Sequence, residues 1–283
     1  MLPPAVGDFL RNEGGHVIDF TRLTGGEISS TYRLRTTKGF SAVLKTSNAA
    51  PADMYLREAA GLAALRGVGA LRAPDVYLVG HDHLLLEDLG VSEKTEENWE
   101  AYGRALAAQH QTVGPWFGWA EDNYLGTLPQ LNTPTADGHE FFARLRILRY
   151  LDTPRCAEAF DGDDRRAIEG LAERLPQLVR AHDPVLLHGD LWRENMIAQQ
   201  RPAAIDPAVH YGWATAELAM VQQCGGVPDV FFAAYREAAG MKDDREWAQE
   251  LDVLSIREHL SAVAHQGDRD AADRARQISR RFG

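Results

Sequence analysis

The spacing of apolar residues divides the chain into a short strand-rich part and a longer helical part. Between residues 17 and 46, apolar and β-branched residues form short runs that alternate with polar residues and are separated by turns such as Lys38-Gly39. This pattern predicts three antiparallel strands. Residues 52–66 carry apolar side chains at helical spacing, and two further short strands are predicted within residues 75–89.

From residue 90 onward the strand signal nearly disappears and helical spacing takes over. The exceptions are an irregular stretch at residues 113–135 and a strand–loop–strand region at residues 185–206. We therefore predict an α+β fold with a small antiparallel-sheet lobe over residues 1–89 and a larger, mainly helical lobe over residues 90–283. Helices are predicted over residues 95–112, 138–150, 164–181, 214–224, 228–240, 244–265 and 268–281.

Composition and charge narrow the possible functions. The 283 residues are 45% hydrophobic and 25% charged, as in ordinary soluble globular proteins. The formal net charge of −11, without a block of Lys or Arg, disfavours nucleic acid as a partner. The sequence has neither a run of about 18 apolar residues to span a membrane nor a signal-peptide pattern at its start. We expect a soluble, cytoplasmic protein with no membrane partner, and the oligomeric state stays open.

Several common catalytic and binding motifs are absent from the sequence. It contains no GxxxxGK[ST] and no GxGxxG phosphate or dinucleotide loop, and no HExxH or GxSxG. The two cysteines, Cys156 and Cys224, lie far apart and form neither a CxxC pair nor a disulfide framework. We predict that both are small core residues in a reducing compartment.

The densest group of chemically reactive residues lies in residues 185–208. A short apolar run precedes a loop with His188, Asp190 and Asn195, and a second apolar run ends in Asp206. The loop between the two predicted strands returns the chain to the same edge of the strand pair. The carboxylate of Asp190, the amide of Asn195 and the carboxylate of Asp206 can therefore lie close together. Phosphoryl transfer in kinases requires this set: one Asp orients and deprotonates the acceptor hydroxyl, and an Asn and a second Asp hold Mg²⁺. The spacing His-x-Asp-x₄-Asn matches a kinase catalytic loop.

Each of these residues also has an ordinary structural explanation. Asp190 can cap a loop, Asn195 can stabilise a turn, and Asp206 can cap a helix. These separate roles do not explain the joint spacing, so we favour the catalytic interpretation. We interpret His188 as a residue that organises the loop by hydrogen bonding and not as a proton carrier.

The strand-rich part supplies residues that can bind nucleotide phosphates. Lys45 ends the third predicted strand, and Glu58, thirteen positions later on the next helix, is placed to pair with it. Either residue alone would be an ordinary solvated surface residue, but beside a kinase catalytic loop the paired role is favoured. The loop between the first two strands, which alone would be an ordinary hairpin loop, can bring backbone N–H groups near phosphate. Its small residues are Gly25, Gly26, Ser29 and Ser30.

At these positions the sequence resembles the fructosamine (ketosamine) kinases, which are relatives of the aminoglycoside and choline kinases. The matching runs include GGEISSTYRL, MYLREAAGLAALR, FGWAEDNYLGTLPQLN, LLHGDLWRENM and AIDPAVHYG, and the matches extend over roughly residues 24–240. FGW-x-x-DN and HGDLW are specific to this family. The resemblance implies a protein-kinase-like fold of two lobes and ATP-dependent phosphorylation of a hydroxyl on a sugar bound to an amine.

The resemblance also implies roles for the matching residues. Asp190 corresponds to the catalytic base, and Asn195 and Asp206 correspond to ligands of Mg²⁺. Lys45 corresponds to the lysine that binds the phosphates of ATP, and Glu58 is its partner.

Two further regions correspond to binding sites in the family. The segment Glu87-Asp88-Leu89, where the lobes join, corresponds to backbone that hydrogen-bonds adenine. The irregular stretch at residues 115–126 gathers aromatic and polar residues. Aromatic residues in such a stretch are most often core residues, but the loop with Asp122 and Asn123 can also wall a polyol or amine pocket. By analogy with the family, the residues that border the acceptor are Trp119, Asp122, Asn123 and Trp192.

The sequence departs from the family pattern on the substrate side. Arg193 and Glu194 stand where family members commonly have Ser-Gly, and Thr215 and Glu217 stand where the family usually has an acidic residue and then Asp. The last helices keep little of the usual ending beyond His259. Because the ATP and metal residues are intact, these departures put the acceptor in question more than the reaction.

Two alternatives therefore stay open. The first is a kinase for another amino-sugar, an aminoglycoside or an amino-alcohol. The second is a nucleotide-binding regulator without catalysis, for which Arg193 and Glu194 are the only supporting features.

Overall fold

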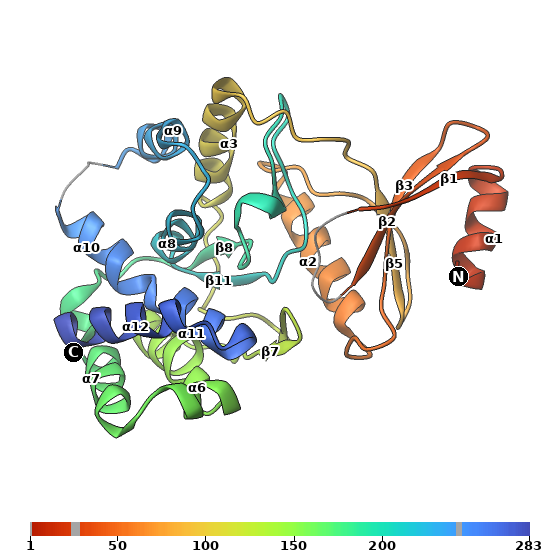
Figure 1. The fold of residues 1–283 in the computed structure, drawn as a ribbon. Helices are drawn as coiled ribbons and strands as arrows, with labels where there is room; N and C mark the ends of the chain where they lie inside the picture. Colours follow the sequence, from red (N-terminus) through yellow and green to blue (C-terminus); the bar gives the residue numbers. More distant parts are fainter. Residues whose placement is uncertain (1, 24–28, 242–244) are drawn as a thin grey trace.

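A computed structural model describes residues 2–23, 29–241 and 245–283, and it shows a sheet-rich lobe beside a larger helical lobe (Figure 1). The five strands of the first lobe lie in the order β1-β2-β3-β5-β4, and every neighbouring pair is antiparallel. The predicted α+β fold of two lobes is thereby confirmed. The strands are β1 (Val17–Arg22), β2 (Ser30–Thr36), β3 (Ser41–Thr46), β4 (Val76–Val79) and β5 (His83–Glu87).

Helix α1 (Pro4–Glu13) packs on the sheet and was not predicted. Its buried residues Val6 and Leu10 join an apolar cluster with residues of β2 and β3, such as Leu34 and Leu44. Pro4 at the first helical position is a start signal, because its missing N–H is not needed there. With only one turn of clear apolar spacing, α1 depends on the sheet for its stability.

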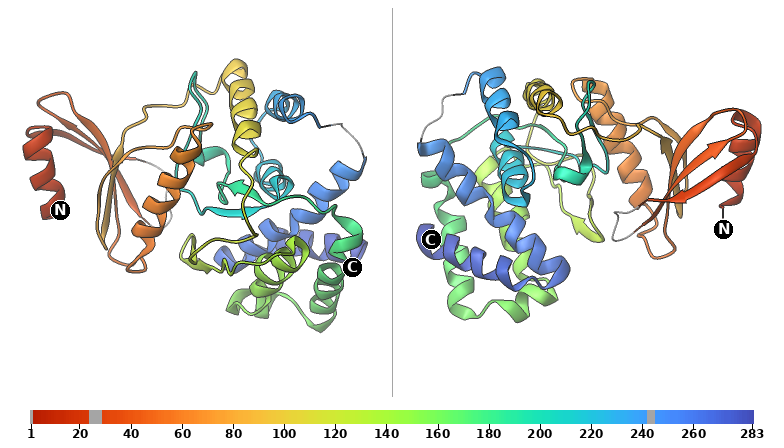
Figure 2. Two further views of the ribbon diagram at one scale, coloured as in Figure 1. Left: turned by 180° about the vertical axis from the view of Figure 1, so that it is seen from behind. Right: turned by 45° about the horizontal axis from the view of Figure 1, so that its top comes forward.

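Helix α2 (Met54–Val68) lies between the sheet and the helical lobe in both views of Figure 2. Its buried residues, including Leu62 and Leu65, belong to a cluster that contains Leu84 from the sheet and Val209 from the helical lobe. At Gly61 the backbones approach so closely that an added β-carbon would lie 3.2 Å from the side chain of Pro207. Helix α2 therefore joins the apolar cores of the two lobes.

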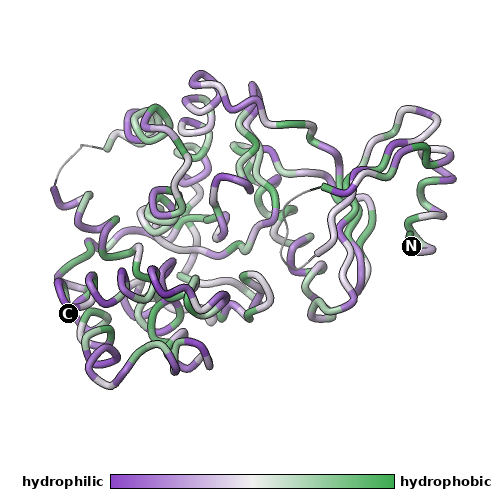
Figure 3. The backbone as a smooth tube through the Cα atoms, in the orientation of Figure 1, coloured by the Kyte–Doolittle hydropathy of each residue, from purple (hydrophilic) through white to green (hydrophobic). Residues whose placement is uncertain are grey.

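Helices α3 and α9 of the helical lobe lie side by side. Gly103 makes this packing possible, because an added β-carbon would lie 2.3 Å from the carbonyl oxygen of Phe231. Polar residues dominate the outer helix α12 in Figure 3, as expected for a surface helix. None of the helices in the described ranges combines the length and apolar character needed to cross a bilayer. The helices are α3 (Glu96–Gln109), α4 (Gly138–Phe142), α5 (Arg149–Leu151), α6 (Pro154–Ala159), α7 (Gly162–Leu178), α8 (Ala214–Cys224), α9 (Asp229–Ala239), α10 (Arg245–Leu254), α11 (Ile256–Gln266) and α12 (Arg269–Phe282).

The structure differs from the predicted helices in two places that matter for the site. The helix predicted over residues 244–265 is two helices, which meet at Ser255, where the side-chain hydroxyl donates a hydrogen bond to the carbonyl of Asp252. The helix predicted over residues 138–150 contains a π-helical segment, η1 (Ala143–Leu148). Such segments are rare and occur frequently at functional sites.

Short strand pairs hold the loops of the helical lobe. Strand β8 (Val185–Leu187) pairs with β11 (His210–Gly212), and between them β9 (Met196–Ile197) pairs with β10 (Ala203–Ala204). A separate hairpin, β6 (Asn123–Leu125) and β7 (Leu128–Gln130), lies in the stretch expected to be irregular.

The prediction for the cysteines holds for only one of them. Cys156 is buried and unpaired, as expected. Cys224 is exposed and unpaired, because it is the last residue of α8, where the chain leaves the core through Gly225.

Candidate active site

The catalytic-loop residues come together between β8 and β9. The side-chain amide of Asn195 donates hydrogen bonds to the backbone carbonyl of Asp190 at 2.8 Å and to its Oδ2 at 3.2 Å. Asn195 lies at the end of a short 3-10 turn, η2 (Arg193–Asn195), and is 5% exposed. The five-residue spacing in the sequence thus becomes a direct contact that orients the Asp190 carboxylate.

The surroundings of Asp190 prepare it to accept a proton near neutral pH. Burial raises the pKa of Asp190 to about 7, and the guanidinium of Arg257 opposes this increase. The carboxylates of Glu258 and Asp206 add to it. A general base works best when its pKa is close to the working pH.

His188 organises the loop, in agreement with the sequence interpretation. Its Nε2 lies 2.9 Å from the carbonyl of Ile205, and its Nδ1 accepts a hydrogen bond of 3.3 Å from the backbone N–H of Asp190. These partners require the neutral ring with the proton on Nε2. Burial lowers the pKa of His188, which keeps the ring uncharged.

Glu217 on α8 binds the backbone of the catalytic loop. Its two carboxylate oxygens accept backbone hydrogen bonds from Gly189 at 2.6 Å and His188 at 3.2 Å. His110 lies 3.0 Å from the same carboxylate and 2.7 Å from the hydroxyl of Tyr235. The departure of Glu217 from the family pattern therefore does not remove support for the loop. His110 and Tyr235 were missed, since neither position carries a local motif.

Lys45, Glu58 and Asp206 form a second polar cluster. The ammonium of Lys45 lies 2.7 and 2.8 Å from the two carboxylate oxygens of Glu58 and 3.1 Å from Oδ1 of Asp206. Burial disfavours the charged ammonium, but the carboxylates of Asp206 and Glu58 outweigh it and raise the pKa of Lys45. Lys45 is therefore a fixed cation that faces the catalytic loop.

The oxygen atoms near Asp190 fit a hard divalent cation. Asn195 uses its NH₂ group to bind Asp190, which leaves its amide oxygen free to coordinate. The side chain of Asp206 is 37% exposed, and its backbone has a φ of 59°, which is uncommon for a residue other than glycine. Mg²⁺ commonly takes only one or two protein ligands together with substrate phosphates. The described residues contain no cluster of three or more His, Cys, Asp or Glu side chains that suits a metal ion.

The segment that joins the lobes leaves part of its backbone available. Asp88 accepts hydrogen bonds from the hydroxyl of Ser41 at 2.6 Å and from the guanidinium of Arg33 at 3.0 Å, so the segment is held from the sheet. Glu87 forms an ion pair with Arg72. Within the described ranges the backbone of Leu89 makes no hydrogen bond, as an adenine-binding position requires.

The phosphate-covering loop is described only in part. Gly25 and Gly26 lie outside the described residues. The hydroxyl of Ser29 lies 2.8 Å from that of Tyr55 on α2, and Ser30 begins β2 opposite Thr46.

The predicted acceptor residues are divided between two environments. Trp192 follows the catalytic loop and is 39% exposed. Asn123 is buried in the hairpin β6–β7, where it donates a hydrogen bond of 2.8 Å to the carbonyl of Val209. The carboxylate of Asp122 accepts a hydrogen bond of 2.7 Å from the backbone N–H of Asn132. The ring of Trp119 packs against that of Tyr211, with the ring centroids 5.1 Å apart. The contacts of these three residues support the loop at 119–132, and only Trp192 adjoins Asp190 in the chain.

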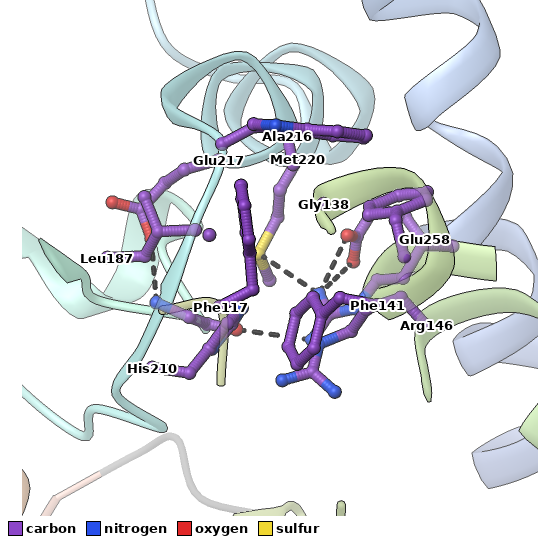
Figure 4. A pocket seen from close by; sticks show the side chains of 15 residues that line it. Phe117, Gly138, Phe141, Arg146, Leu187, His210, Ala216, Glu217, Met220 and Glu258 are labelled. Carbon is purple, nitrogen blue, oxygen red and sulfur yellow. Dashed lines mark hydrogen bonds and ion pairs between the residues drawn. The ribbon is translucent and has the colours of Figure 1, made fainter. Parts of the chain in front are cut away.

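A pocket lies directly behind the catalytic loop, between α8, α11 and the π-helical segment (Figure 4). Arg257 on α11 donates hydrogen bonds of 3.2 Å to the carbonyl of Gly189 and 2.7 Å to the carboxylate of Glu258. Arg146 lies 4.5 Å above the ring of Phe141, and burial lowers the pKa of Arg146 to about 9. The segment that forms α11, with Arg257 and Glu258, was noted only as a departure from the family, so the closeness of these two residues to the catalytic loop was missed.

Comparisons with known proteins show which family the chain resembles. A sequence model described as fructosamine kinase matches residues 10–278. A protein named probable ketoamine kinase from Synechocystis sp. is 33% identical over 199 residues, which are 68% of this chain and 67% of that protein. The chloroplastic protein-ribulosamine 3-kinase of Oryza sativa subsp. indica is 32% identical over 82% of this chain and 70% of its own length. A crystal structure from Thermobifida fusca YX-ER1, described as that of a candidate fructosamine-3-kinase, has 29% identity and a TM-score of 0.86, and covers 98% of this chain and 97% of that one.

Proposed function

The chain belongs to the fructosamine kinase family, and on that premise we propose that it transfers the γ-phosphate of ATP to a hydroxyl of a sugar-amine. The observation that carries the proposal is the pair of contacts in which Asn195 binds the carboxylate of Asp190 and Lys45 binds that of Asp206. The names of its relatives, ketoamine kinase and protein-ribulosamine 3-kinase, support a sugar-amine as the acceptor.

In the proposed reaction, Asp190 orients the acceptor hydroxyl and accepts its proton. The hydroxyl oxygen forms a bond to the γ-phosphorus while the bond from that phosphorus to the bridging oxygen of ATP breaks, and ADP leaves. Lys45, held by Glu58, neutralises charge on the phosphates. Positioning and charge stabilisation supply most of the rate in such transfers.

We assign a Mg²⁺ site to the amide oxygen of Asn195 and the carboxylate of Asp206. The bound ion would neutralise the phosphate oxygens. The ammonium of Lys45 lies 3.1 Å from Oδ1 of Asp206 in the structure, so the proposed cation site adjoins the group proposed to bind the phosphates.

The nucleotide would bind between the lobes, and the division of the chain into residues 1–89 and 90–283 remains our proposal. Adenine would meet the backbone at Glu87 and Leu89, and the loop with Gly25, Gly26, Ser29 and Ser30 would cover the phosphates. Trp192 is the proposed acceptor-side residue, and an acceptor role for Trp119, Asp122 and Asn123 stays a prediction. A cytoplasmic location also stays a prediction.

The test is ATP consumption with Mg²⁺, measured for the wild type beside Asp190→Ala. The acceptor panel contains fructosamines, ribulosamines, free sugars and aminoglycosides. We expect turnover on ketosamines that falls by at least about 1000-fold in the variant, because the base and its orienting contact are lost. Nucleotide binding, measured separately by calorimetry, should persist in the variant. Turnover confined to aminoglycosides would reassign the acceptor, and full activity of the variant would remove Asp190 from the mechanism.

A further inference from the structure

Gly189, immediately before Asp190, is held in a backbone conformation that glycine adopts more readily than any other residue. Its φ is +82°, and an added β-carbon would lie 2.1 Å from the carbonyl oxygen of Ala208. Because glycine also has the greatest backbone freedom, the two peptide groups that flank Gly189 are not fixed by local sterics. The position of the Asp190 carboxylate therefore depends on contacts that hold these two peptide groups from outside.

Two charged side chains from two different helices bind these peptide groups. Glu217 on α8 accepts a hydrogen bond of 2.6 Å from the N–H of Gly189, in the first peptide group. Arg257 on α11 donates a hydrogen bond of 3.2 Å from Nη2 to the carbonyl of Gly189, in the peptide group that leads into Asp190. Glu217 and Glu258, the carboxylate that pairs with Arg257, lie on opposite sides of the pocket in Figure 4. Gly189 is therefore bound at both its N–H and its carbonyl.

The guanidinium of Arg257 is itself fixed by burial and by an ion pair. Arg257 is 5% exposed, and its Nη1 donates hydrogen bonds of 2.7 and 2.8 Å to the two carboxylate oxygens of Glu258. The carboxylate compensates the charge of the guanidinium, and because the guanidinium is planar, the pairing also sets the direction of Nη2. Nη2 can therefore donate only at a set position beside the catalytic loop.

The same Nη2 is connected to the segment that follows Asp206. It lies 3.2 Å from the side-chain oxygen of Gln130, which is 1% exposed. The side-chain nitrogen of Gln130 donates a hydrogen bond of 3.0 Å to the carbonyl of Ala208, two positions after Asp206. Arg257 thus joins the peptide group before Asp190 to the chain after Asp206 through one intervening amide.

We propose that Arg257 is a positioning residue for phosphoryl transfer, which fixes Asp190 relative to Asp206 by binding the carbonyl of Gly189 and the side chain of Gln130. This inference rests on the proposed function, because it concerns the geometry of the same site. It also gives a role to α11, where the sequence departs from the family pattern. Because Arg257 acts through the backbone, its loss should lower kcat and leave the KM values for ATP and the acceptor nearly unchanged.

The first variant is the double substitution Arg257→Met with Glu258→Gln, which removes the guanidinium without leaving its carboxylate partner buried and unpaired. It is assayed with ATP and the ketosamine of the panel that the wild type phosphorylates, at a temperature at which thermal melts show the variant folded. We expect kcat to fall by about 10- to 100-fold, because the Asp190 carboxylate is misplaced, and both KM values to change by less than about threefold.

Arg257→Lys separates the guanidinium from Glu258, because it changes only the first of the two residues. A lysine keeps a cation beside the carboxylate but lacks the planar fork that binds Glu258 and Gly189 in two directions. Its kcat should lie between the values of the wild type and the double variant.

The matched control is the double substitution Arg276→Met with Asp164→Asn. Arg276 on α12 also joins a buried carboxylate, that of Asp164 at 2.7 Å, to a backbone carbonyl, that of Ala159 at 2.6 Å. These contacts connect α12 with α7 and the end of α6. The control should lose stability in thermal melts and keep its kcat.

A wild-type kcat in the folded double variant of Arg257 and Glu258 would overturn the inference and leave the kinase assignment standing. If this variant does not fold, a wild-type kcat in Arg257→Lys has the same consequence. An equal loss of kcat in the control would also contradict the inference, because general destabilisation would then explain the effect. Absence of turnover by the wild type on every acceptor of the panel would overturn the proposed function and this inference with it.

Discussion

The nucleotide side and the acceptor side of the candidate site are built differently. Lys45 is 7% exposed and Asn195 is 5% exposed, and each contacts other polar groups of the site. On the acceptor side, Trp192 is 39% exposed and Arg193 has no polar partner among the described residues. The residues proposed to act in phosphoryl transfer are fixed by burial and several contacts, whereas Trp192 and Arg193, which follow Asp190 in the chain, are open to solvent. We therefore expect substitutions at the exposed positions to disturb the buried cluster less than substitutions at Lys45 or Asn195.

The largest effect is expected on the nucleotide side. Lys45→Met removes the cation that faces Glu58 and Asp206, and it should lower kcat/KM for ATP by roughly 100- to 1000-fold, as the loss of a charge-stabilising group does. Lys38→Met, in the exposed turn between β2 and β3, is the control and should behave as the wild type. A Lys45→Met enzyme with the kcat/KM of the wild type for ATP would contradict the role of Lys45 on the nucleotide side.

A smaller effect on activity is expected at Glu217, the residue of α8 that binds the backbone of the catalytic loop. Glu217→Gln keeps the size of the side chain but removes the charge that accepts the backbone N–H groups of His188 and Gly189. We expect kcat to fall roughly 10- to 100-fold, because the loop is misplaced. Glu250→Gln is the matched control, since Glu250 is equally buried and pairs with Arg180 at 2.7 Å. This variant should lose stability in thermal melts and keep its kcat, and a similar loss of kcat in both variants would argue against a specific role for Glu217.

The same carboxylate predicts a pH dependence of stability. Burial raises the pKa of Glu217, but its bonds with His110 and the backbone outweigh burial and hold the pKa below its ordinary value. The stabilisation is therefore present above the unfolded-state pKa and is lost as the pH falls through the lower pKa of the folded state. Thermal melts between about pH 6 and about pH 3 should show a steeper loss of Tm in the wild type than in Glu217→Gln. Equal losses of Tm with falling pH in the wild type and in Glu217→Gln would contradict the assignment of this stabilisation to Glu217.

The smallest effect on activity is expected at Asn123. Its amide donates to the carbonyl of Val209 and accepts from Gln130 and Asn132, so Asn123→Ala should cost about 2 kcal/mol of stability by leaving these groups unpaired. If these contacts are the whole role of Asn123, the KM for the acceptor should change by less than about threefold, which corresponds to less than about 0.7 kcal/mol. Asp122→Ala, at an exposed neighbouring position, should affect stability less. A large increase in the acceptor KM of Asn123→Ala would place Asn123 in the acceptor pocket, as the family resemblance implies.

Local pattern was sufficient for much of the fold. The strands of residues 17–46 follow from alternation and turn residues, and helices such as α3 and α9 follow from apolar spacing, because these signals depend on neighbours only a few positions apart. Helix α1 and the break at Ser255 were not predicted, since the first depends on packing against the sheet and the second on a hydrogen bond within one turn.

The sequence by itself pointed to the reaction, because the spacing of Asp190, Asn195 and Asp206 matches a kinase catalytic loop and Lys45 and Glu58 stand upstream of it. Only the tertiary structure decided what surrounds them. The contacts of Glu217 with His188, of Arg257 with Gly189 and of Arg193 with Gly226 join residues 29, 68 and 33 positions apart. No local pattern encodes such contacts, because they depend on how helices α8 and α11 pack against the catalytic loop.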